Sequence, residues 1–92
     1  MRRIERKLFD IGDEIRALEH AEQLASEELI YHEHLNDDAQ RDAAVSEHPI
    51  DRADARETAG DVGRFERHLA ELRQRRARLE VKRQKLIERL GD

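Results

Sequence analysis

Apolar and small residues in the first half of the chain recur at alternating steps of four and three, the spacing of a coiled-coil seam. These positions are Ile4, Leu8, Ile11, Ile15, Leu18, Ala25, Leu29, Ala39 and Ala43. Polar residues interrupt the seam at Glu22, His32 and Asn36. The pattern predicts one long amphipathic α-helix over residues 2–45.

The helical pattern breaks at Ser46-Glu47-His48-Pro49, which predicts a turn over residues 46–49. Proline lacks the N–H that a helix interior requires, and it biases His48 away from the α region. The same spacing then returns at Ala55, Val62, Phe65, Leu69, Leu72, Leu79, Leu86 and Leu90. It predicts a second helix over residues 50–90 that ends at Gly91.

The two seams are in register for an antiparallel hairpin, because facing residues have numbers that add to 94. Leu8 then meets Leu86, and Leu29 meets Phe65. The midpoint of these facing pairs lies inside the predicted turn. This agreement supports the hairpin, because the two seams are assigned without reference to the position of the proline. We therefore predict an all-α fold, a long antiparallel two-helix coiled-coil hairpin that forms a single domain over residues 1–92.

Glu22 lies one layer from Arg76 across this seam. The two side chains can pair diagonally and define the register, as polar seam residues often do. Alternatively, Arg76 lays its methylene groups along the seam and extends its guanidinium into solvent. Both interpretations fit the sequence.

A second polar stretch of the seam contains His32, Asn36 and Thr58. It lies beside Gly60 and Gly63, and each glycine destabilises a helix interior by up to about 1 kcal/mol relative to alanine. The sequence therefore predicts a bend or a frayed turn in the second helix near these glycines.

Composition supports long helices with a narrow core, since 43% of the residues are charged and only three are aromatic. The chain has no cysteine, which excludes disulfides and thiolate metal sites. No apolar run approaches the roughly 20 residues that cross a bilayer, and no apolar signal-peptide segment follows Met1 to Lys7. We expect a cytoplasmic protein.

The sequence contains no recognisable catalytic constellation or cofactor motif. His32 and His34 are two residues apart and point to different helix faces, so they do not form a metal-ligand pair. Asp37, Asp38 and Asp42 would need a desolvating pocket to act as an acid and base pair, which a two-helix rod cannot build. We therefore expect no enzyme activity, no metal and no cofactor.

Charge is unevenly distributed although the net charge is only −4. Residues 33–61, around the turn, contain nine acidic and three basic side chains. A basic region far from the turn includes Arg73, Arg75, Arg78, Lys82 and Lys85. This region could contact an acidic protein surface, whereas direct nucleic-acid binding is not expected because stacking aromatic residues are missing there.

A weaker apolar stripe on the first helix includes Leu24, Tyr31 and Leu35. A two-helix hairpin buries little surface per residue, so it gains from a further contact. The stripe could pair two hairpins into a four-helix bundle or receive another protein. We expect a homo-oligomer.

The turn sequence resembles the coiled-coil tip of the DksA/TraR family, whose tip motif is Asp-x-x-Asp-x-Ala, often with proline after the first Asp. Pro49, Asp51, Arg52 and Ala53 fit that pattern, while His48, with Glu47 beside it, occupies the first acidic position. The family's four-cysteine zinc finger has no counterpart in this sequence. The resemblance implies a hairpin that inserts its tip into the secondary channel of bacterial RNA polymerase, with Asp51 as the working carboxylate.

The sequence thus predicts a non-enzymatic, protein-binding helical hairpin, in the manner of a DksA-like transcription regulator. The residues expected to contact the partner are Glu47, His48, Pro49, Asp51, Arg52 and Ala53. An alternative function is a structural or scaffolding coiled coil that forms a homodimeric four-helix bundle.

Overall fold

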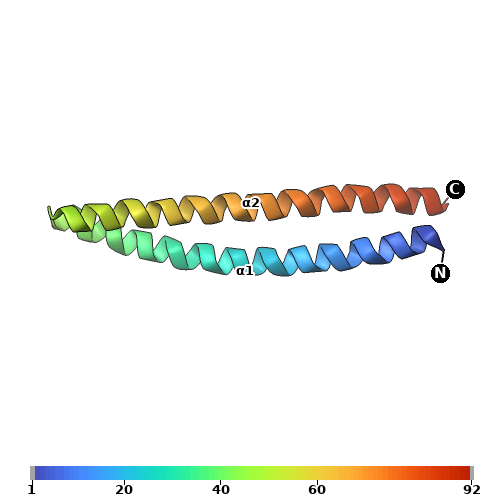
Figure 1. The fold of residues 1–92 in the computed structure, drawn as a ribbon, viewed down its shortest axis with the longest axis horizontal. Coiled ribbons are helices and arrows are strands. Elements are labelled where there is room, and N and C mark those ends of the chain that lie inside the picture. Colours follow the sequence, from blue (N-terminus) through green and yellow to red (C-terminus); the bar gives the residue numbers. More distant parts are fainter. Residues whose placement is uncertain (1, 92) are drawn as a thin grey trace. The chain divides into compact units, whose positions relative to one another are not determined.

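The computed structural model describes residues 2–91, which form two α-helices joined by a short turn (Figure 1). Helix α1 spans Arg3–Val45 and helix α2 spans Pro49–Gly91, so each boundary lies within one residue of the position expected from the sequence. No strand occurs among the described residues. The fold is an all-α antiparallel helical hairpin.

The hairpin divides into two compact units, each built from one segment of α1 and one of α2. The terminal unit contains the described parts of residues 1–23 and 70–92. The turn unit is Leu24–Leu69 and contains the connection between the helices. The two units differ in what holds their helices together.

The terminal unit is held by a branched aliphatic core. Ile11, Ile15 and Leu86 are buried in one cluster, and Ile4, Leu8 and Leu79 pack against it. The cluster contains both members of two pairs expected from the register, Leu8 with Leu86 and Ile15 with Leu79. Burying one such side chain contributes about 1.5–3 kcal/mol, so these six residues are the main source of stability in this unit.

The turn unit has a smaller and more polar seam. Its buried hydrophobic residues are Ala25, Ala55 and Leu69. The Thr58 hydroxyl lies 3.1 Å from Asn36 Oδ1 and can donate to it, which confirms the predicted contact between these two residues. Gln40 Nε2 also donates to the backbone carbonyl of Ala55 (3.3 Å). Small side chains and hydrogen bonds therefore replace the aliphatic core near the turn.

Of the two alternatives predicted near Gly60 and Gly63, the frayed turn is wrong, because α2 remains helical through both residues, while the bend stays a prediction. The Arg64 and Arg67 side chains cover the glycines, and their guanidinium groups would lie 3.7 and 3.3 Å from an added Cβ atom. A cost of about 1 kcal/mol per glycine is too small to interrupt a helix that has regular turns on both sides.

Neither helix contains, within the described residues, an apolar segment long enough to cross a membrane.

Candidate functional site: the turn and its charged surroundings

The connection between the helices is ordered by local hydrogen bonds. The Ser46 N–H donates to the backbone carbonyl of Asp42 (2.8 Å), which adds one bond beyond the last residue of α1. The Ser46 hydroxyl oxygen accepts from the His48 N–H (3.3 Å). The three-residue connection is therefore constrained from both sides rather than open.

His48 is the N-cap of α2. Its Nδ1 atom accepts from the Ile50 N–H (3.2 Å), and its backbone carbonyl accepts from the N–H groups of Asp51 (3.1 Å) and Arg52 (3.3 Å). Pro49 occupies the first helical position, where no N–H is needed. The sequence analysis placed His48 at the tip without recognising this role, because histidine is an uncommon cap.

The residues expected at the tip lie together around this cap. Glu47, His48, Pro49, Arg52 and Ala53 are exposed, and Asp51 is half-buried. Asp51 stands in the first turn of α2, where a carboxylate interacts favourably with the positive end of the helix dipole. That local role and a partner contact are compatible, because part of its surface remains accessible.

Two apolar tip residues were missed by the sequence analysis. Val45 is 87% exposed and Ile50 is 63% exposed, more than any other large hydrophobic residue among those described. They flank the turn, one at the last position of α1 and one at the second position of α2. Neither residue fits the four-and-three spacing of the seam, and this is the signal in the sequence that their side chains would be exposed. The turn therefore combines exposed apolar groups with carboxylates.

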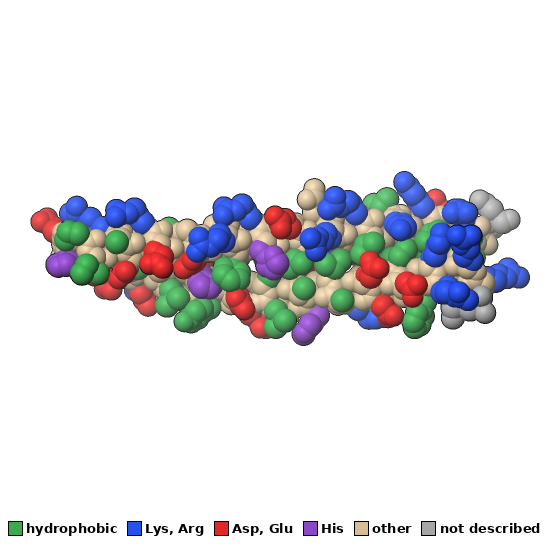
Figure 2. Space-filling model, in the orientation of Figure 1, with side chains coloured by type: hydrophobic (Ala, Val, Ile, Leu, Met, Phe, Trp, Pro, Cys, Tyr) green, Lys and Arg blue, Asp and Glu red, His purple; other side chains and the backbone are tan. Residues whose placement is uncertain are grey.

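The two units carry opposite charge. The turn unit contains 12 acidic and 5 basic residues, a net charge of −7, while the terminal unit contains 10 acidic and 13 basic residues, a net charge of +3. Figure 2 shows both signs in each half, with carboxylates and a few basic side chains close to the turn and a denser group of lysine and arginine side chains in the terminal unit. A protein surface that contacts the turn would experience a negative electrostatic potential, so a surface rich in basic residues would be favoured as a partner.

The basic residues predicted far from the turn are all exposed on α2 of the terminal unit. Arg73 forms an ion pair with Glu22 (3.8 Å). Arg75, Arg78, Lys82 and Lys85 have no carboxylate within 4.0 Å among the described residues, and their spacing of three and four places them on one side of the helix.

The polar interruption of the seam in the terminal unit is an ion-pair network. Arg76 donates through Nε to Glu22 Oε2 (2.5 Å) and through Nη2 to Glu22 Oε1 (3.1 Å), and its Nη1 donates to Glu80 (2.8 Å). These hydrogen bonds, that from Glu22 first, raise the pKa of the Arg76 guanidinium above its ordinary value. The diagonal pair is therefore present, and the alternative of a solvent-directed Arg76 is wrong.

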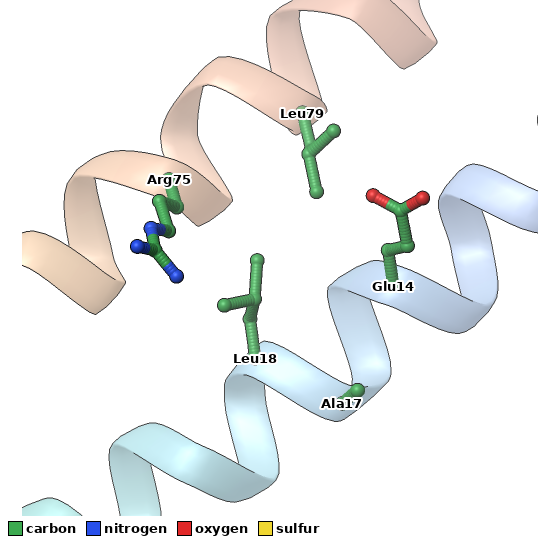
Figure 3. A pocket seen from close by; sticks show the side chains of 5 residues that line it. All are labelled: Glu14, Ala17, Leu18, Arg75 and Leu79. Carbon is green, nitrogen blue, oxygen red and sulfur yellow. The ribbon is translucent and has the colours of Figure 1, made fainter.

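A shallow hollow interrupts the surface of the terminal unit close to this network. Figure 3 shows Leu18 of α1 and Leu79 of α2 directed towards it, with Glu14 and Arg75 at its edges and Ala17 completing its lining. Its floor is apolar, and it carries one anionic and one cationic group. The sequence analysis did not identify it, because it depends on the separation of the helices.

His32 lies in the seam of the turn unit between two aromatic rings. It stacks on Phe65 with ring centroids 4.5 Å apart and meets Tyr31 edge-on at 5.3 Å. Its buried Nδ1 has no hydrogen-bond partner in the part of the chain that the structure describes. The two ring contacts make His32 a packed residue of the seam. No group of three or more possible metal-ligating side chains occurs among residues 2–91.

The residues predicted to form a dimer face are exposed on α1 of the turn unit. Leu24 is 49% exposed, Tyr31 60% and Leu35 37%. Leu24 and Tyr31 line a groove with Glu27, Glu28 and His32. The face therefore combines apolar groups with carboxylates.

Comparison with known proteins gives no match to a protein-family model, to a curated protein or to a solved structure.

Proposed function

We propose that this protein is a non-enzymatic binding hairpin whose turn enters a narrow cavity of a larger protein machine. The hydrogen-bonded, acidic turn supports this proposal most directly. Because Ser46 and His48 already hold the connection in one conformation, little conformational entropy would be lost when a partner closes around it.

The dimensions of the turn unit suit insertion. Its α1 segment contains 22 residues, which corresponds to about 33 Å at 1.5 Å per residue. Two adjacent helices, each about 10 Å across with side chains, can enter a channel that excludes a globular domain. The charge of −7 on this unit favours a channel lined by cationic groups or a bound metal ion.

The secondary channel of bacterial RNA polymerase is the specific target that we propose, from the tip resemblance. Asp51 and Ala53 occupy the second acidic position and the alanine position of the tip motif. His48 caps α2 where the motif has its first acidic residue, with Glu47 adjacent and exposed. In this proposal Asp51 and Glu47 supply the carboxylates of the tip.

The proposal can be tested by retention of purified bacterial RNA polymerase on the immobilised protein. The test variant combines Asp51→Ala with Ala53→Thr, and the control combines Glu57→Ala with Ala59→Thr, which changes exposed residues further along α2. We expect the wild type and the control to retain polymerase and the test variant to lose it, with equal helicity by circular dichroism. Equal retention by all three proteins, or by none, would refute the proposal.

A further inference from the structure

The first surface that the proposed function does not use is a line of exposed cations on α2. We name it the basic stripe, and it consists of Arg75, Arg78, Lys82, Lys85 and Arg89. All five are exposed, and none has a carboxylate within 4.0 Å among the described residues. By contrast, Arg16 and Arg41 pair with nearby aspartates of their own helix. The charge of the basic stripe is thus left for a binding partner to neutralise.

The second surface is on α1 of the turn unit and has the opposite sign. We name it the acidic stripe, and it consists of Leu24, Glu28, Tyr31, Leu35, Asp38 and Asp42, which are spaced by four and three on one side of the helix. All six are exposed, and three of them are apolar. The α1 segment 24–45 carries six acidic residues and one basic, and the α2 segment 70–91 carries three acidic and eight basic. Their net charges are therefore −5 and +5.

The apolar part of the acidic stripe has a matching feature beside the basic stripe. The hollow of Figure 3 has Leu18 and Leu79 in its lining and Arg75, the first residue of the basic stripe, at its edge. A leucine side chain or a tyrosine ring that enters it would bury apolar surface. The methylene groups of Arg75 can pack against either side chain, and its guanidinium can stack on a tyrosine ring. Glu14, on the other edge, can accept from a tyrosine hydroxyl.

We infer that a second copy of this chain covers both surfaces, with the acidic stripe of one copy on the basic stripe of the other. Because the acidic stripe belongs to the turn unit, this dimer is the free state of the protein and separates before the turn enters a partner. Each copy carries one stripe of each sign, so two copies are enough to satisfy all four stripes in a closed dimer. The first and last residues of the acidic stripe are 18 positions apart and those of the basic stripe are 14 positions apart, or about 27 and 21 Å along their helices, so their charges can align over most of their length. A nucleic-acid backbone would use the cations but leave Leu24, Tyr31 and Leu35 uncovered, and the carboxylates of the turn unit would repel it.

Sedimentation equilibrium of the full chain at micromolar concentration tests this inference. One variant makes the basic stripe acidic with Arg78→Glu, Lys82→Glu and Lys85→Glu, and the other makes the acidic stripe basic with Glu28→Lys, Asp38→Lys and Asp42→Lys. We expect the wild type to be a dimer and each variant alone to dimerise with an affinity reduced about tenfold or more. Mixing the two variants should restore the dimer, because each acidic surface then meets a basic one.

The control variant changes three exposed cations outside the basic stripe, with Arg52→Glu, Arg56→Glu and Arg67→Glu. It has the same net charge as the first variant and should still dimerise. Circular dichroism of every variant checks that the hairpin is folded. A monomeric wild type, a mixture that stays monomeric, or open-ended growth beyond the dimer would each overturn the inference. So would a wild-type monomer that binds a short random-sequence DNA duplex through the basic stripe.

Discussion

Glu22 and Arg76 lie on opposite helices and form a two-point ion pair across the seam of the terminal unit. The Glu22 side chain is only 12% exposed, and its charge is matched by Arg76 and, at 3.8 Å, by Arg73. A one-residue slip of either helix would separate these groups. The pair therefore acts together with the aliphatic cluster in defining which residues face each other.

We predict that removing one partner of this pair destabilises the hairpin more than replacing both. Glu22→Leu leaves Arg76 with Glu80 alone, and Arg76→Leu leaves a largely buried carboxylate whose one remaining ion-pair partner among the described residues is the exposed Arg73, 3.8 Å away. The double leucine variant should have a higher urea midpoint than either single variant. Additive effects of the two substitutions would contradict the prediction.

The contribution of the Glu22–Arg76 pair to the free energy of unfolding should not decline in moderately alkaline solution. The folded-state pKa of Arg76 is raised above the ordinary arginine value, so its stabilising effect is complete below the unfolded-state pKa and is lost only as the pH rises through the higher folded-state pKa. The stability difference between the wild type and Arg76→Leu should therefore stay constant between about pH 8 and pH 10. A steady decrease over this range, measured by urea unfolding, would argue against the assignment.

His32→Leu is expected to stabilise the protein by about 1 kcal/mol, because it removes a buried nitrogen that lacks a hydrogen-bond partner. The loss of stacking on Phe65 is offset by aliphatic contact with the same ring. Urea unfolding measures the change. His34→Leu, at an exposed position of the same helix, is the control and should have little effect.

His48→Ala should lower stability by about 1 kcal/mol through loss of the α2 cap, while His48→Asn, with a better capping side chain, should preserve it. The effect should be local, so amide hydrogen exchange at Ile50, Asp51 and Arg52 should accelerate in the alanine variant. Unchanged exchange at these three amides would contradict the role of His48 as the cap.

Gly60→Ala should stabilise α2 by about 0.5–1 kcal/mol, since the residue is in a continuous helix and an added Cβ meets only the end of the Arg64 side chain at 3.7 Å. Thermal unfolding provides the measurement. Destabilisation would indicate that the helix needs the flexibility of glycine at this position.

Hydrogen exchange should be uneven along the hairpin. Amides between Asn36 and Thr58 should exchange faster than those of Leu8 to Ile15 and Leu79 to Leu86, because Ala55 is the one buried hydrophobic side chain described in the former segment. Mass spectrometry of exchanged peptides resolves these segments. Equal protection of these segments from exchange would show that the polar seam near the turn stabilises the helices as much as the aliphatic core does.

Much of the fold was predictable because it depends on spacing along the chain. The four-and-three pattern sets the apolar side of each helix, and Pro49 sets where α2 begins. The shared register then brings Asn36 to Thr58 and Leu8 to Leu86. The same reasoning located the tip residues, because residues next to a proline turn must lie at the end of a hairpin.

The tertiary structure decided which atoms meet within that framework. It placed the His32 ring on Phe65 and left Val45 and Ile50 exposed, whereas the cap at His48 is a local contact within the first turn of α2. It also selected the ion pair of Arg76 over the solvent-directed alternative and kept α2 helical through its glycines. Periodicity depends on the local chain and can be read from one sequence. Side-chain partners depend on rotamers, interhelical separation and competing hydrogen bonds, which exist only after both helices are in place.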